Sequence, residues 1–207
     1  PLTGIASFAQ MLGEMTSPED PRARLVDKLV DQSFRVSRIV ANLHEAVRGS
    51  RGDRVVIDLG AVAGRAAADA ARSLNAGDRL RLDCPEVPVL VWGSLGAVEL
   101  AVSNLVRNAV EASPDESALE VRVRQDGAWA ELMVDDAGPG VPEELVKQVF
   151  EPFFTTKNER GGTGLGLAIT RDMIAQLGGE VRLERSPLGG ARATIRLPRW
   201  EEPPQSS

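Results

Sequence analysis

The sequence predicts an α+β fold: a helical hairpin precedes a two-layer sandwich with helices on one face of a mostly antiparallel sheet. Three observations lead to this prediction. Residues 1–48 carry apolar side chains at helical spacing, the composition changes at a glycine- and arginine-rich stretch, and two hairpin signals are interleaved with helical patterns in the rest of the chain. The 207 residues suffice for one well-buried domain of ordinary size plus a smaller appendage.

The first 48 residues are predicted to form two helices separated by the proline-containing stretch "TSPEDP". The second helix, from about Arg22 to Val47, repeats apolar residues in a heptad-like series, which requires a partner helix. Two helices alone bury too little apolar surface, so we expect residues 1–48 to form a homodimer as a four-helix bundle. The alternative is that this hairpin packs on the downstream domain. Residues 49–54 have the composition of a linker.

Residues 55–199 are expected to form the second domain, and residues 200–207 a frayed tail. An alanine-rich helix is closed by Asn75 and Gly77, and the Asp126-Gly127 pair between two flanking strands is a strong hairpin signal. The expected elements are, in order, a strand at 54–59, a helix at 60–75, strands at 78–84 and 87–92, a long helix at 94–113, a hairpin at 119–136, a short helix near 142–150, a helix at about 165–177 and a hairpin at 179–198.

Charge and composition limit the partners. The net charge of −6 argues against a broad nucleic-acid surface, and no apolar run is long enough to span a membrane, so we expect neither nucleic-acid binding nor membrane contact by these residues. The single cysteine, Cys84, fits a reducing cytoplasm, and together with the single His44 it is too little for structural zinc. Because the start lacks both a methionine and a signal peptide, we expect a fragment whose parent could be membrane-anchored upstream.

The stretch "GGTGLGLAI", residues 161–169, places four glycines immediately before an apolar helix. A glycine loop that opens into a helix N-terminus presents free N–H groups and the positive end of the helix dipole, which together favour a phosphate. The spacing is neither that of a Walker A loop nor that of a dinucleotide-binding fingerprint. The alternative interpretation is a glycine hinge.

A second stretch, "VDDAGPGVP" at 134–142, places Asp136 at the end of a predicted strand, with Gly138 and Gly140 behind it. A carboxylate at the base of a pocket can accept a hydrogen bond from an exocyclic amine such as that of adenine. The nearby glycines would let a flat ring approach the backbone. The alternative is an ordinary Asp-Gly turn.

The third stretch, "ELAVSNLVRNAVEA" at 99–112, places Asn104, Asn108 and Glu111 on one face of the long helix. Asparagine is a poor helix former, so two on one face suggest a function. Amide oxygens are hard ligands that Mg²⁺ accepts alongside phosphate oxygens. The alternative is a solvated helix edge.

Taken together, these stretches resemble the ATP-binding domains of two-component sensor histidine kinases, which belong to the superfamily of DNA gyrase, Hsp90 and MutL. "NLVRNAVEA" is similar to the N box, "DDAGPG" to the G1 box, "FEPFFTTK" at 150–157 to the F box and "GGTGLGLAI" to the G2 box, all in family order. The start, "PLTGI", is similar to the segment that follows the phospho-acceptor histidine in the dimerisation helix. The resemblance therefore extends to residues 1–48.

The resemblance implies a role for each matching residue. Asp136 would bind the adenine amino group in a pocket shaped by Gly138 and Gly140. Asn108, with Asn104 beside it, would ligate Mg²⁺, and both would be catalytic. Residues from about 151 to 162 would form a lid over the nucleotide. The remaining residues expected to contact ATP are Thr156, Lys157, Gly162, Thr163, Gly164, Leu165 and Gly166.

Asn104 also bears on the reaction. The ATP-hydrolysing branches of the superfamily carry a glutamate there as general base, and an amide cannot take a proton. The resemblance therefore implies that the γ-phosphoryl group is transferred to a histidine, expected upstream of Pro1, and then to an aspartate of a response-regulator receiver domain. His44, on the second helix, is not the expected acceptor. The alternatives are an anti-sigma-type serine/threonine kinase and a degenerate nucleotide-binding scaffold.

Overall fold

The computed structural model describes residues 53–156 and 163–201, together with the single residues Met11, Met15, Thr16, Asp20 and Val26. The expected hairpin over 1–48 otherwise lies outside the described residues, as do most of the linker at 49–54 and the tail beyond Glu201. The homodimer through residues 1–48 therefore stays a prediction.

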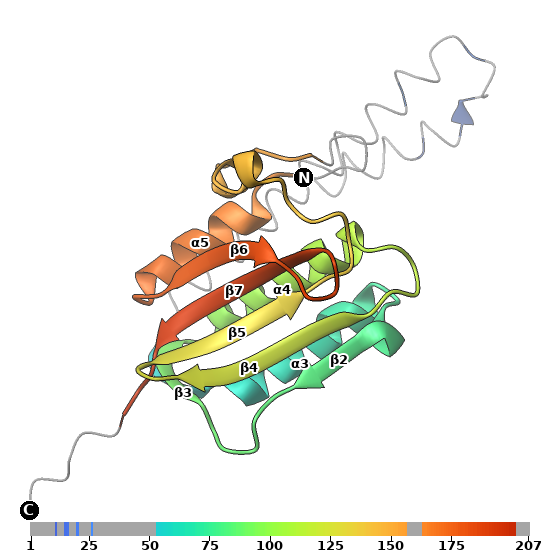
Figure 1. Ribbon diagram of the computed structural model, residues 1–207. Helices are drawn as coiled ribbons and strands as arrows, with labels where there is room; N and C mark the ends of the chain where they lie inside the picture. Colours follow the sequence, from blue (N-terminus) through green and yellow to red (C-terminus); the bar gives the residue numbers. More distant parts are fainter. Residues whose placement is uncertain are drawn as a thin grey trace, which may run out of the picture.

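The described chain forms two layers, a five-stranded sheet and three helices that cover one of its faces (Figure 1). The strand order is β2-β4-β5-β7-β6, and every neighbouring pair is antiparallel except the parallel pair β2–β4. The predicted α+β sandwich with a mostly antiparallel sheet is therefore confirmed. The strands of this sheet are β2 (Leu80–Asp83), β4 (Leu119–Asp126), β5 (Trp129–Asp135), β6 (Glu180–Arg185) and β7 (Ala191–Pro198).

The first and third strands do not join this sheet. β1 (Arg54–Asp58) and β3 (Leu90–Ser94) pair with each other as a separate antiparallel ribbon. Their inward side chains, Ile57 and Val91, are buried in the common core. The sequence predicted both strands but not this separate sheet.

The helices begin and end where local chemistry favours it. α3 (Leu59–Ser73) is N-capped by Asp58, whose Oδ1 accepts a hydrogen bond from the Gly60 N–H at 3.0 Å, and Asn75 adopts a left-handed φ of 55° just beyond its end. α4 (Leu95–Ala112) and α5 (Gly166–Gln176) complete the layer. The short helix expected near 142–150 is instead two 3₁₀ turns, Glu143–Leu145 and Gln148–Phe150, because so short a segment cannot offset the cost of nucleating an α-helix.

The strands alternate between the helix layer and an open face. Leu132 of β5, Leu105 of α4 and Ile174 of α5 are fully or almost fully buried between the layers. On the open face, arginines of β4 and β7 pair with carboxylates of the neighbouring strands. This alternation directs Asp135 to the open face and its neighbour Asp136 to the side of the helices.

Candidate functional site

A cavity of about 370 Å³ lies between α4, the ends of β5 and β7, and the start of α5. Its volume lies within the range of about 300–1,000 Å³ that is usual for small-molecule sites. It gathers most of the residues that the sequence analysis singled out, although they are far apart in the chain. Those that line it are Asn104, Asn108, Glu111, Asp136, Gly140, Thr156, Thr163, Gly164 and Gly166.

Four of the expected residues stand apart from this set. Gly138 and Leu165 are described but do not line the cavity. Gly138 packs on the end of α4, where a Cβ atom would lie 2.6 Å from the Ala112 carbonyl oxygen, and Leu165 is buried. Lys157 and Gly162 lie outside the described residues.

Asp136 is held firmly at the base of the cavity. Its side chain is buried, and Oδ1 accepts hydrogen bonds from the N–H groups of Gly138 at 2.8 Å and Ala191 at 3.0 Å. Both main-chain polar groups of Asp136 are hydrogen-bonded. Its N–H donates to the Ala191 carbonyl at 3.0 Å, and its carbonyl accepts from the Gly190 N–H at 3.1 Å. Gly190 and Ala191 thus both lie opposite Asp136. Such a pairing of two residues with one is a β-bulge, a feature that is common beside active sites.

Gly190 is a site residue that the sequence analysis missed. A Cβ atom at this position would lie 2.0 Å from Asp136 Oδ1 and 2.5 Å from the Gly138 nitrogen. Only glycine allows the hairpin to approach the carboxylate so closely. The signal in the sequence is the doubled glycine in "LGGAR", which by itself predicts only the turn of the second hairpin.

The asparagine face of α4 forms one wall. Asn104 is 5% exposed, and its Nδ2 donates a hydrogen bond of 3.5 Å to the Thr170 hydroxyl of α5. A Cβ atom on Gly166 would lie 4.0 Å from Asn104 Oδ1, so the start of α5 faces this amide directly. Asn108, one turn further along α4, lines the same cavity. Asn104 is therefore next to the helix N-terminus that would face a phosphate.

The backbone conformation and close packing at Gly164 require a glycine whether or not a ligand is bound. Its φ is +67°, and a Cβ atom would lie 2.4 Å from the main-chain carbon of Phe153. The Phe153 N–H donates to the Gly164 carbonyl at 2.9 Å. Main-chain contacts therefore bind the start of the expected lid to the residues that directly follow its end.

Apolar side chains line the cavity from both layers. Val134 of β5, Leu183 of β6 and Ala193 of β7 come from the sheet, and Leu105 and Ala109 come from α4. Small and branched apolar side chains beside a fixed carboxylate suit a flat ring that carries one polar edge.

The donor set fits Mg²⁺ carried by a phosphate ligand. Within 53–156, 163–201 and the isolated described residues, no group of three or more histidine, cysteine or acidic side chains could hold a metal by itself. Mg²⁺ commonly takes one or two protein ligands and completes its shell with waters and phosphate oxygens, so an amide oxygen of Asn108 or Asn104 suffices. The described helices include none long and apolar enough to cross a bilayer.

Comparison with known proteins agrees with this geometry. The family described as "Histidine kinase-, DNA gyrase B-, and HSP90-like ATPase" matches residues 94–201. Sensor-type histidine kinase PrrB of Mycobacterium tuberculosis is 32% identical over 205 residues, which are 96% of this chain and 45% of PrrB. Sensor histidine kinase CpxA of Escherichia coli is 42% identical over 129 residues, which are 60% of this chain and 28% of CpxA. The chain therefore spans less than half the length of these curated relatives.

Solved structures show the same likeness. The ATP-binding domain of PrrB from Mycobacterium tuberculosis aligns with a TM-score of 0.59 at 35% identity, covering 72% of this chain and 99% of that domain. The catalytic domain of histidine kinase ThkA aligns with a TM-score of 0.63 at 25% identity, covering 71% and 96%.

Proposed function

Because the chain belongs to the histidine kinase-, DNA gyrase B- and HSP90-like ATPase family and carries the ATP-binding domain of a sensor histidine kinase, we propose that it binds Mg²⁺·ATP and transfers the γ-phosphoryl group to a histidine of its own protein. A response-regulator aspartate then receives the group. Both steps take place in the cytoplasm, and residues 1–48 provide the dimer contact.

The fixed carboxylate of Asp136 carries this proposal. Because two main-chain N–H groups hold its Oδ1, the side chain is oriented before any ligand arrives. It would accept the hydrogen bond of the adenine amino group while the ring lies against the apolar wall formed by residues such as Val134 and Ala193. A preorganised acceptor lowers the entropy cost of binding.

The other end of the cavity would hold the triphosphate. The start of α5 and the main chain at Thr163–Gly164 line it, and the N–H groups and dipole of a helix start favour a phosphate. Asn108, with Asn104 beside it, would hold Mg²⁺, which when bound neutralises phosphate charge. Asn104 is an amide and cannot deprotonate water, so it leaves the γ-phosphoryl group intact for the histidine. Catalysis then consists mainly of positioning and electrostatic stabilisation.

The two alternatives are less well supported. The relatives are named histidine kinases, which does not favour an anti-sigma-type serine/threonine kinase. The cavity brings together residues of all four boxes, and this intact set does not favour a degenerate scaffold.

Calorimetric titration of the 207-residue chain with ATP and Mg²⁺ tests the nucleotide part. We expect Asp136→Asn to weaken ATP binding by about 10- to 100-fold, because it removes a charge-assisted hydrogen bond. Asp69→Asn, at an exposed aspartate of α3 paired with Arg72, is the matched control and should bind as the parent chain does. Equal affinity of parent and Asp136→Asn would contradict the pocket assignment.

The transfer step needs the chain extended upstream to include the expected histidine. Incubation with γ-labelled ATP should give a phosphoryl group that is labile in acid and stable in base. A phosphoserine would instead support the serine kinase.

A further inference from the structure

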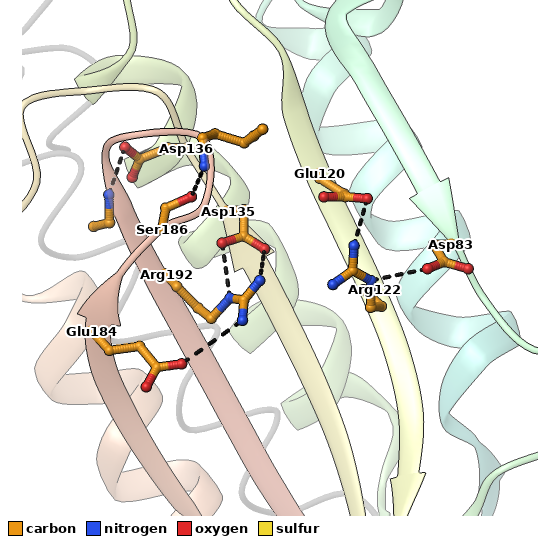
Figure 2. A network of polar contacts seen from close by, with 10 residues as sticks. Asp83, Glu120, Arg122, Asp135, Asp136, Glu184, Ser186 and Arg192 are labelled. Atoms are coloured by element: carbon orange, nitrogen blue, oxygen red, sulfur yellow. Dashed lines mark hydrogen bonds and ion pairs between the residues drawn. The ribbon is translucent and has the colours of Figure 1, made fainter.

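An ion pair lies on the open face of the sheet directly behind the cavity. Arg192 of β7 donates two hydrogen bonds to Asp135 of β5, from Nε to Oδ1 and from Nη2 to Oδ2, each 2.9 Å long (Figure 2). The side chains are only 16% and 1% exposed. Glu184 approaches Arg192 at 4.0 Å from β6, so the bidentate contact with Asp135 is the dominant one.

The position of this pair in the sheet is informative. Asp135 and Arg192 are register partners, and they form the last regular pair of β5 and β7 before the bulge. The next residues, Asp136 and Ala191, point to the helix side and meet through the bonds that orient the Asp136 carboxylate. Each member of the ion pair is thus the immediate chain neighbour of a residue at the base of the pocket.

We propose that the Asp135–Arg192 pair is a positioning device for base recognition, which sets Asp136 at the depth needed to select adenine. This inference rests on the proposed function. The pair fixes the β5–β7 register where the ladder becomes irregular, and register decides which face every side chain points to. Because Asp135 is almost fully buried, loss of its partner leaves an uncompensated charge that favours separation of the strand ends. Asp136 and Ala191 would then part by a fraction of an ångström or more.

The same two strands offer a control pair. Glu131 and Arg196 are also register partners on the open face of β5 and β7, with Arg196 Nε 2.9 Å from Glu131 Oε1 and side chains 18% and 8% exposed. This pair lies four residues from Arg192 along β7, about 13 Å further from the pocket. Glu131 also pairs with Arg124, and Arg196 also lies near Asp126 and Glu180. Arg196→Met therefore controls for general destabilisation of the sheet by loss of an open-face arginine.

The experiment compares ATP with inosine triphosphate, in which a carbonyl oxygen replaces the amino group that Asp136 would bind. Affinities are measured for the parent chain, Arg192→Met and Arg196→Met. We expect Arg192→Met to weaken ATP binding about tenfold and inosine triphosphate binding by less than about threefold, whereas Arg196→Met preserves the parent ratio. Arg192→Lys keeps the charge but loses the bidentate geometry, so its ratio of ATP to inosine triphosphate affinity should lie between those of the parent chain and Arg192→Met. This variant also provides the test if Arg192→Met does not fold.

The outcomes separate this inference from the function on which it rests. A parent chain that prefers ATP, with the same preference in Arg192→Met and Arg192→Lys, would overturn the positioning role and leave the proposed function intact. Equal loss of preference in Arg192→Met and Arg196→Met would also overturn it, because the effect would then be general destabilisation of the sheet. A parent chain with no preference for ATP would overturn both.

Discussion

Replacing Gly190 with alanine tests how the hairpin holds Asp136, the carboxylate proposed to bind adenine. The added Cβ atom would lie 2.0 Å from Asp136 Oδ1, 2.5 Å from the Gly138 nitrogen and 2.6 Å from the Asp136 carbonyl oxygen. Folded proteins essentially never contain such contacts to a Cβ atom. Two of the three are main-chain atoms, and the third, Oδ1, is held in place by two N–H groups.

The size of the effect follows from the required shift. Relief of the clash moves Asp136 or the hairpin by about 1 Å, and a 1 Å misplacement of a binding group can cost about 100-fold, or about 2.7 kcal/mol. The hydrogen bonds that cross this contact, from the Ala191 N–H to Oδ1 and from the Gly190 N–H to the Asp136 carbonyl, would lengthen together. We therefore expect Gly190→Ala to lose about 100-fold in ATP affinity.

Calorimetric titration with ATP, accompanied by thermal unfolding followed by circular dichroism, provides the measurement. Gly189→Ala is the control within the same turn: its φ is +100°, so alanine strains the backbone, but no atom lies within 4 Å of the added Cβ atom. It should lower the melting temperature and leave ATP affinity within about threefold. ATP binding by Gly190→Ala within threefold of the parent chain would refute the reasoning.

Two further predictions concern metal and thiol chemistry. Asn108→Ala should reduce by about tenfold the gain in ATP affinity that Mg²⁺ provides, with little change in EDTA, as measured by paired titrations; an unchanged gain would exclude Asn108 as a ligand. Burial, and then the nearby charges of Asp83 and Asp58, raise the pKa of the Cys84 thiol, so alkylation near pH 8.5 should be slower in the folded chain than after unfolding. Only the unfolded thiol ionises readily there, so this contribution to stability is complete at neutral pH and is lost as the pH rises above the unfolded pKa.

Local patterns in the sequence were enough for most of the elements. The hairpin at Asp126-Gly127 was predictable because strand alternation and turn chemistry act over a few residues, and Gly127 indeed has a φ of +57°. Pairing between distant strands leaves no such local trace. The separate β1–β3 ribbon and the parallel placement of β2 beside β4 depend on which edges meet after the helices pack, so the sequence did not predict them.

The candidate site also combines features that local sequence patterns predict with features that depend on contacts between distant segments. The sequence singled out Asp136, Asn104 and Asn108 because each departs from what its own element favours, such as an amide on a helix face or a carboxylate at a strand end, and all three line one cavity. Gly190 was missed because a glycine that serves a turn and a glycine that admits a distant carboxylate look alike in sequence. Gly164 shows the converse, since its contact with the main chain of Phe153 accounts for it without any ligand.

The charge of the pocket explains why the two amides matter. Among the described residues that line it, Glu111 and Asp136 carry negative charge and Arg107 alone is a cation. A triphosphate that met only this described lining would face a net negative charge, with Arg107 and the dipole of α5 as the described sources of positive charge. Mg²⁺ bound with the ligand would add positive charge, and neutral amide oxygens would accept it without adding repulsion. A carboxylate at Asn104 or Asn108 would bind the metal more strongly but would add repulsion of the phosphates and, at Asn104, a base for water. On the proposed function, the amides would therefore hold the metal without supplying a base for water, which is the selectivity that a phosphoryl donor requires.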